Sequence, residues 1–208
     1  KQEQRGTPYD RIRREAISNL SDRAVVEIAK RVGVPVTTSS GRLRSNAREL
    51  LHDGLQHVKH LVLQLGILHV SDISFLAGLS QLQMLFLSHT TINDPSPLAG
   101  LSQLRLLFLS HTDLRDLSPL TELPRLQVLN VTDAHISDLS PLAELRQLQA
   151  LGLIWARVND LTPLAGLRQL KLLDLSDTNV RDLSPLTELT QLQILCLSYT
   201  QVRDLSPL

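Results

Sequence analysis

The stretch that decides the fold contains one 22-residue pattern twice, as LQMLFLSHTTINDPSPLAGLSQ at residues 82–103 and LRLLFLSHTDLRDLSPLTELPR at 104–125. Leucines recur at matching places in both copies, and each copy carries an aspartate followed by x-Ser-Pro-Leu. Self-similarity at a fixed period of this length is typical of solenoids and related repeat arrays.

The aspartate of this pattern recurs at intervals of 22 through most of the sequence. Its seven copies are Asp72, Asp94, Asp116, Asp138, Asp160, Asp182 and Asp204. A leucine follows each of them four residues later, and a proline precedes that leucine in six of the seven, with Phe75 in the first. We infer seven units of one array.

The composition argues against several classes of protein. The 208 residues hold 21 basic and 21 acidic side chains, so no overall charge favours nucleic acid or a membrane surface. Leucine occurs 47 times, 42 of them from Leu61 onward. The one cysteine, Cys196, excludes an internal disulfide framework and a multi-cysteine metal site. No apolar run approaches the ~18 residues of a membrane span.

A single unit can be interpreted from its residues. Leu85 and Leu87 alternate with other residues, as in a short strand with one buried face. Ser96 before Pro97 is typical of a helix N-cap followed by proline at the first helical position. Leucines spaced by three then suit a short helical or 3₁₀ segment at 98, 101 and 104. Stacked units would share one leucine core, with a parallel sheet on one face of a right-handed solenoid.

This pattern resembles the leucine-rich repeat family, in the short 22-residue class typified by bacterial internalins. The resemblance covers residues 58–208 and implies an α/β solenoid: a right-handed superhelix with a parallel concave sheet, short helical or 3₁₀ convex segments and an α-helical N-terminal cap. We assign residues 1–55 to the cap region and 56–208 to a solenoid of seven 22-residue units, truncated at its C-terminus. An uncapped last unit would lead either to further repeats or to association through that end.

One departure from the family concerns the residue after each strand. Many members carry asparagine there, whereas this chain has Thr90, Thr112, Thr178 and Thr200, with Ala134 and Ala156. A threonine hydroxyl can still bond the turn backbone, but alanine cannot. We therefore expect the ladder of side-chain bonds to be interrupted at the fourth and fifth units.

The first 55 residues contain five leucines and no repeat. Helices are expected from Pro8 to about Ile17, after Ser21 up to Gly33, and from about Arg42 to His52 with a stop at Gly54. Residues 1–60 carry a net charge of +5 (12 basic, 7 acidic), and an alanine-x-x-x-glycine spacing at 29–33 resembles helix-turn-helix DNA-binding units. The stretch 35–41 is too long and too glycine-broken for the usual tight turn, which favours capping or protein contact over DNA binding.

Variation between units is concentrated in outward-facing positions, which we group in three columns. The strand-start column is Val62, Met84, Leu106, Val128, Ala150, Leu172 and Ile194. The strand-centre column is Gln64, Phe86, Phe108, Asn130, Gly152, Asp174 and Cys196. The strand-end column is Ile67, His89, His111, Asp133, Trp155, Asp177 and Tyr199. Four of the six aromatic residues lie in the last two columns, where a leucine solenoid has no structural need for them.

The predicted partner-binding residues are taken from the last two columns. They are Phe86, His89, Phe108, His111, Asn130, Asp133, Trp155, Asp174, Asp177 and Tyr199. Exposed aromatics are the usual anchors of protein interfaces. The partner would need an apolar or aromatic end and a basic end, because charge shifts from histidine and phenylalanine to aspartate along the array.

No phosphate loop, nucleophile elbow or paired metal motif occurs, so we predict neither catalysis nor a cofactor. The seven repeated aspartates suggest calcium, but their fixed place before a serine or threonine favours turn geometry. His89, His111 and Asp133 share one column and allow a zinc site as an alternative to a solvated recognition face.

We expect a non-catalytic module that binds a protein or peptide on its concave face, within a larger bacterial sensor, effector or adhesin. A structural or engineered repeat scaffold is one alternative, and a DNA-contacting N-terminal segment regulated by the array is another. A cytoplasmic location is favoured, and a secreted or cell-surface one if a leader precedes Lys1.

Overall fold

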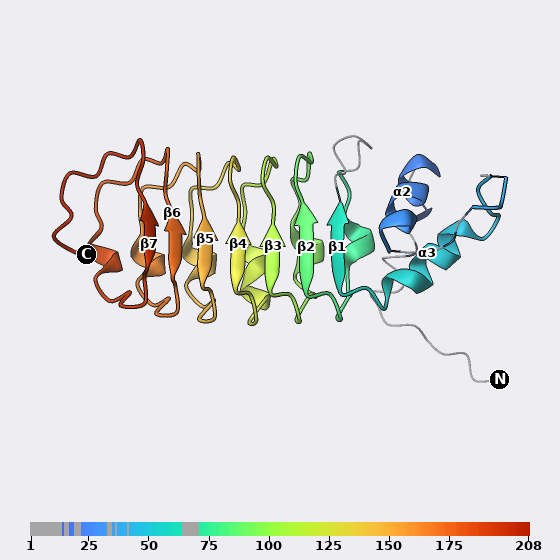
Figure 1. Ribbon diagram of the computed structural model, residues 1–208, viewed down its shortest axis with the longest axis horizontal. Coiled ribbons are helices and arrows are strands. Elements are labelled where there is room, and N and C mark those ends of the chain that lie inside the picture. Colours follow the sequence, from blue (N-terminus) through green and yellow to red (C-terminus); the bar gives the residue numbers. More distant parts are fainter. Residues whose placement is uncertain are drawn as a thin grey trace.

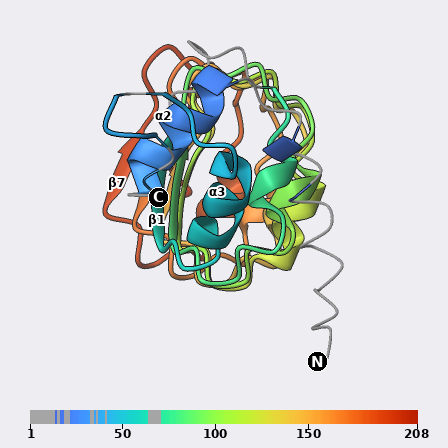
Figure 2. The ribbon, with the colours of Figure 1, turned by 90° about the vertical axis from the view of Figure 1, so that its right-hand side faces the viewer.

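The computed structural model describes residues 14, 17–18, 22–32, 35, 37–40, 42–63 and 71–208. It shows an elongated solenoid with a row of parallel strands along one side and helices at its N-terminal end (Figure 1). Figure 2 looks at that end and shows the coils stacked behind one another.

The strands form one seven-stranded sheet in the order of the sequence, and every neighbouring pair is parallel. They are β1 (His60–Leu63), β2 (Met84–Leu87), β3 (Leu106–Phe108), β4 (Val128–Asn130), β5 (Ala150–Gly152), β6 (Leu172–Asp174) and β7 (Ile194–Cys196). From β2 onward each residue pairs with the one 22 positions later, as Met84 does with Leu106. The predicted parallel sheet is confirmed.

The first unit is longer than predicted. His60 pairs with Met84 and Val62 pairs with Phe86, an offset of 24 rather than 22. Placing Val62 in the column of Met84, and Gln64 in that of Phe86, was therefore wrong. Because Asp72 keeps its interval of 22 to Asp94, the two extra residues fall between β1 and Asp72. Gln64 and Ile67 lie outside the described residues.

In the first six units, a short 3₁₀ segment lies on the side of the coil away from the strands (Figures 1 and 2). The segments are Ser74–Leu76, Ser96–Leu98, Ser118–Glu122, Ser140–Leu142, Thr162–Leu164 and Ser184–Leu186. The predicted N-cap role of the hydroxyl residue is wrong, because this residue begins the segment and the N-cap is the residue before it, which makes no side-chain cap bond. The aspartate two residues before the hydroxyl residue accepts the backbone N–H of that residue instead.

That aspartate bond recurs in all seven units. The Oδ1 atom of each aspartate accepts the backbone N–H two residues later at 2.7–2.9 Å. This confirms the turn-geometry interpretation of the aspartates. The bonds favour the charged carboxylate, so the pKa of Asp138 is lowered by the Ser140 hydroxyl and then by the Ser140 N–H. The pKa values of Asp116, Asp160, Asp182 and Asp204 are lowered by equivalent bonds.

Leucine side chains from every coil fill the interior. In β2 the burial alternates, with Leu85 and Leu87 fully buried and Met84 and Phe86 half-buried. The buried residues form one hydrophobic cluster that extends from Ile17 to Leu189. Burying a leucine contributes about 1.5–3 kcal/mol, and most of that area is shared with the coils above and below.

The threonine ladder occurs as predicted. The hydroxyls of Thr90, Thr112, Thr178 and Thr200 donate to the carbonyl three residues earlier at 3.4, 2.9, 2.6 and 2.8 Å. Ala134 and Ala156 keep only the backbone bond to the equivalent carbonyl, at 3.2 and 2.9 Å. The side-chain ladder is therefore interrupted at the fourth and fifth units.

The described residues include two helices, α2 (Asp22–Val32) and α3 (Ala47–Leu55), at the N-terminal end. Helix α2 agrees with the prediction, whereas α3 begins five residues later than predicted and runs past Gly54. The delay arises because Thr37 and Leu43 form an antiparallel bridge, closed by a 2.8 Å bond from Thr38 N–H to the Arg42 carbonyl. The helix expected at 8–17 lies mostly outside the described residues.

Both helices bury apolar side chains against the array. Val25 and Ile28 of α2 and Leu51 and Leu55 of α3 belong to the same hydrophobic cluster as the leucines. In Figure 2, α3 lies across the end of the coil, with α2 beside it. Within the described part of the chain, no helix is long and apolar enough to cross a membrane.

Replacing Leu107 with alanine should lower the free energy of unfolding by about 2–5 kcal/mol, because this side chain is fully buried between coils. Leu106→Ala is the matched control, since the adjacent side chain is half-exposed on the sheet face. It should cost less than about 1 kcal/mol. Urea unfolding measures both, and equal losses would contradict the assignment of the two faces.

The aspartate bonds also predict an acid dependence. The pKa values of these carboxylates are lower in the folded chain than in the unfolded chain. As the pH falls, the unfolded chain therefore binds protons first, and the stabilisation that the bonds give at higher pH is lost. Asp138→Asn keeps an acceptor oxygen but cannot titrate. Between pH ~2 and ~5 this variant should lose less stability than the wild type. Asp113→Asn is the control, because Asp113 is exposed and accepts no hydrogen bond from the described residues. If the free energy of unfolding changed with pH in the same way in both variants, the role of the aspartate bond would be contradicted.

Candidate functional site

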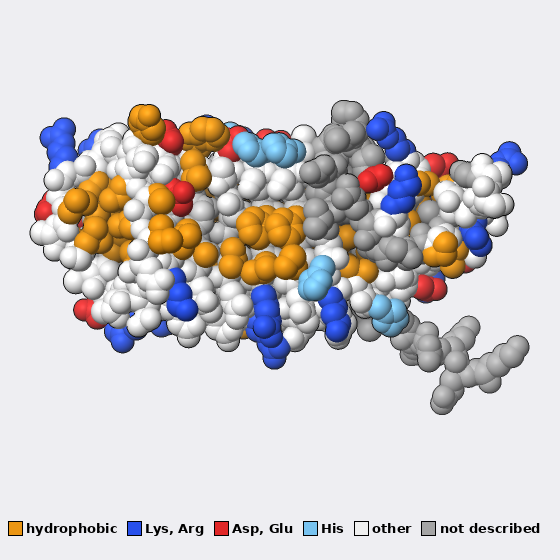
Figure 3. Space-filling model, viewed as in Figure 1, with side chains coloured by type: hydrophobic (Ala, Val, Ile, Leu, Met, Phe, Trp, Pro, Cys, Tyr) orange, Lys and Arg blue, Asp and Glu red, His pale blue; other side chains and the backbone are white. Residues whose placement is uncertain are grey.

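The candidate site is the outward face of the sheet. In its N-terminal half, Phe86 of β2 and Phe108 of β3 pair in register and stack, with ring centroids 4.4 Å apart and an angle of 6° between the rings. Met84 and Leu106 lie beside them on the same two strands and are half-exposed. Figure 3 shows this apolar patch near the middle of the face.

The strand-start column continues the apolar surface toward β7. Val128, Ala150 and Leu172 are half-buried, and Ile194 is 51 % exposed. Lys59, Arg105 and Lys171 directly precede β1, β3 and β6 and are exposed. Basic side chains gather along the edge of the face where the strands begin (Figure 3).

Two predicted site residues also support the backbone. The Oδ1 atom of Asn130 accepts the N–H of Thr132 at 2.9 Å and the hydroxyl of Ser110 at 3.1 Å. Asp174 accepts the N–H of Ser176 in the equivalent way, at 3.0 Å. A Cβ added to Gly152 would come 3.1 Å from Nδ2 of Asn130, so the absence of a side chain there leaves room for the amide.

The strand-end column has a backbone constraint that was not predicted from the sequence. Its six described members all have φ between 54° and 61°, in the left-handed region. They are His89, His111, Asp133, Trp155, Asp177 and Tyr199. Histidine and aspartate are enriched in that conformation, whereas a bulky side chain there is an outlier. The recurrence of histidine and aspartate in this column could have indicated the left-handed backbone from the sequence.

The first three members of this column contact one another. The rings of His89 and His111 stack, with centroids 4.4 Å apart and 9° between the planes. Nδ1 of His111 lies 2.8 Å from Oδ2 of Asp133. The parallel rings do not converge on a common point, and no group of three His, Cys, Asp or Glu side chains among the described residues is placed to hold a metal ion.

The last three members project into solvent. Trp155 is 55 % exposed and Tyr199 is 86 % exposed, and Asp177 between them is also exposed. No salt bridge of the described residues involves Asp177. Figure 3 shows hydrophobic and acidic side chains alternating at this edge of the face, above β5–β7. The ten predicted residues thus comprise a phenylalanine stack, a His-His-Asp chain, two residues that bond the backbone, and this exposed row.

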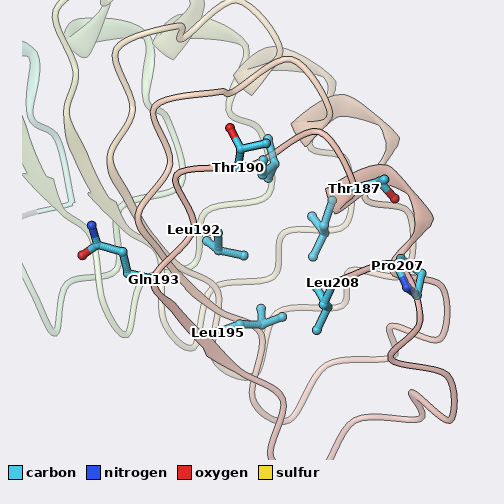
Figure 4. Close-up of a pocket in the computed structure, with 9 residues that line it drawn as sticks. Thr187, Thr190, Leu192, Gln193, Leu195, Pro207 and Leu208 are labelled. Atoms are coloured by element: carbon cyan, nitrogen blue, oxygen red, sulfur yellow. The ribbon is translucent and has the colours of Figure 1, made fainter.

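A separate hollow of about 460 Å³ lies at the end of the core next to β7. Leu192, Leu195 and Leu208 point into one space, while Gln193 points away from it (Figure 4). Its walls come mostly from the last coil, so it is an opening of the leucine core rather than a set of converging polar groups.

Comparison with known proteins agrees with this geometry. Residues 102–144 and 168–208 match the family described as Leucine Rich repeats (2 copies). The structure is similar to internalin C2 of Listeria monocytogenes, with 28 % identity and a TM-score of 0.74, covering 88 % of this chain and 76 % of that one. It is also similar to internalin F of the same organism, with 26 % identity and a TM-score of 0.73, covering 92 % of this chain and 61 % of that one.

A plant peptide hormone receptor, RGFR1, shares the fold alone. The identity is 20 % and the TM-score 0.57, over 73 % of this chain and 26 % of the receptor. No curated protein sequence matches the chain. This chain therefore corresponds to about three fifths of internalin F and about a quarter of the receptor.

The left-handed backbone predicts the stability of variants at residue 155. Trp155→Asn places a tolerated residue at φ 61°, whereas Trp155→Val places a β-branched one there. The asparagine variant should be more stable than the valine variant by about 1 kcal/mol, although both lack the ring. Thermal and urea unfolding compare them, and a valine variant of equal stability would show that the turn relaxes.

Proposed function

The chain is an internalin-like leucine-rich repeat protein, and we propose that it is a non-catalytic module that binds a protein or peptide across the outward face of its sheet. The stacked pair of Phe86 and Phe108 is the observation that carries the proposal. Their rings lie outside the leucine core on a half-exposed apolar face, where the scaffold itself needs no aromatic residue.

The energetics of interfaces support this choice. Aromatic pairs offer a large rigid apolar surface at low cost in side-chain entropy, and such residues supply much of the binding energy of protein interfaces. The half-exposed strand-start column extends the apolar surface from the pair toward β7. A basic edge at one end of the strands and an acidic, aromatic edge at the other would orient a partner that crosses them.

Relatives of the same fold are compatible with the proposal. The plant receptor was solved in complex with RGF2, which shows that such a solenoid can carry a ligand. We extend the proposal to a larger bacterial sensor, effector or adhesin, of which this array is the recognition part.

We also propose that residues 1–55 cap the array. Leu51 and Leu55 of α3 are buried in the same cluster as the leucines of the first coils, and solenoids require such a cover over the end of their core. Arg48 of α3 bonds Asp22 of α2 at 2.8 Å, which ties the two helices together.

Selection of a random peptide library displayed on phage against the chain tests the proposed face. Selected peptides should bind Phe86→Ala/Phe108→Ala about thirty-fold more weakly than wild type, since truncating an aromatic anchor costs about 2 kcal/mol or more. Glu144→Ala/Glu188→Ala, two exposed acids away from the sheet face, is the control and should bind unchanged. Titration calorimetry gives the affinities, and thermal unfolding verifies that the variants fold.

Peptides that bind the phenylalanine variant as tightly as wild type would contradict the proposed face. A loss confined to the glutamate variant would place binding on the convex side instead.

A further inference from the structure

We propose that Trp155, Asp177 and Tyr199 form a slot that holds an arginine side chain of the partner. The inference rests on the proposed function and deepens it, because it names the chemical group that this part of the face recognises. The three residues are successive members of the strand-end column, at equivalent positions of adjacent coils.

The two halves of this column differ in what they contact. In the first half, His89 stacks on His111 and His111 bonds Asp133, so these side chains are partners of one another. The second half has the same backbone and spacing but is exposed to solvent. Among the described residues, no ion pair or ring contact engages Trp155, Asp177 or Tyr199.

The spacing of the coils suits a planar cation. Strands of a sheet lie about 4.8 Å apart, and the His89–His111 stack shows that side chains of this column can meet face to face at one coil's separation, 4.4 Å. Trp155 and Tyr199 are two coils apart, so about 10 Å separates their backbones, with Asp177 between. A guanidinium above Asp177 would have an aromatic ring on each side, within the ~6 Å over which a ring attracts a cation.

The unpaired negative charges around the slot favour a cation as the occupant. Asp174 lies three residues before Asp177 on the same coil, and no basic side chain of the described residues pairs with either carboxylate. Arg181, from the following turn, donates instead to Gln201 at 2.7 Å. Arginine fits better than lysine, because its planar fork can bond a carboxylate with two N–H groups while its faces stack on rings.

The backbone supplies an independent reason to look for a partner here. Tryptophan and tyrosine are poorly suited to φ near 60°, where the rest of the column has only histidine and aspartate. The scaffold gains nothing evident from the two rings, which are mostly outside its core.

The chain contains a single tryptophan, so the indole Nε1–H signal of Trp155 reports on the slot without ambiguity. We would titrate N-acetyl-arginine amide into the chain and follow this signal by NMR, with the N-acetyl amide of citrulline, its neutral isostere, as the comparison. Arginine amide should shift the signal saturably, and citrulline amide should bind at least about tenfold more weakly, because it lacks the charge.

Asp177→Asn should weaken arginine binding about tenfold or more, since asparagine is tolerated at this φ but carries no charge. Tyr199→Asn should weaken it as well. Glu144→Gln makes the same change of charge away from the slot and should leave the affinity unchanged.

Absence of a saturable shift, or equal shifts with arginine and citrulline, would overturn the slot, even if library peptides bind the phenylalanine stack. Lysine amide binding as tightly as arginine amide would overturn the assignment to arginine. The readout needs no protein partner, so its failure is distinguishable from failure of the proposed function.

Discussion

No 22-residue coil of this protein can bury its own leucines, and the rest of the structure follows from that constraint. Each coil presents the edges of its leucine layer to the coils before and after it, so the apolar surface leaves water only when coils stack. Stacking in turn requires neighbouring coils to have one shape. The aspartate bond in every unit and the left-handed residue after each of β2–β7 meet this requirement, because they turn the chain in the same way each time.

Uniform coils bring equivalent residues of successive units together at a fixed spacing. The rings of both stacked pairs, Phe86–Phe108 and His89–His111, have centroids 4.4 Å apart. This distance is close to the ~4.8 Å spacing of neighbouring strands. A surface built in this way is a set of columns, and its chemistry is changed one residue per coil. The backbone conformation also limits which residues suit a column. The positive φ of the strand-end column favours aspartate and disfavours tryptophan.

The period made most of the fold predictable. Leucine alternation predicted the strands, the constant interval predicted their parallel register, and the aspartate and threonine positions predicted the turn bonds. The longer first unit was missed, because Asp72 obeys the period while β1 lies outside it, and only pairing of His60 with Met84 reveals the two extra residues. The start of α3 was missed because the Thr37–Leu43 bridge depends on backbone pairing that no apolar pattern marks.

The site was predictable in outline but not in its division of roles. Sequence columns identified which residues face outward, since that depends only on alternation along a strand. They did not show that Asn130 and Asp174 bond the backbone, or that Gly152 makes room for the Asn130 amide, because these are contacts between coils or across a turn. They also did not separate the His-His-Asp chain from the exposed row beyond it.

The proposed recognition surface is formed by the outward columns of the sheet, and not by the convex side or the ends of the solenoid. A crystal structure of the chain with a bound library peptide would locate this surface. We expect the peptide to lie across β2–β6, in contact with Phe86 and Phe108. A peptide seated on the 3₁₀ segments, or in the leucine-lined hollow beside β7, would overturn the proposal.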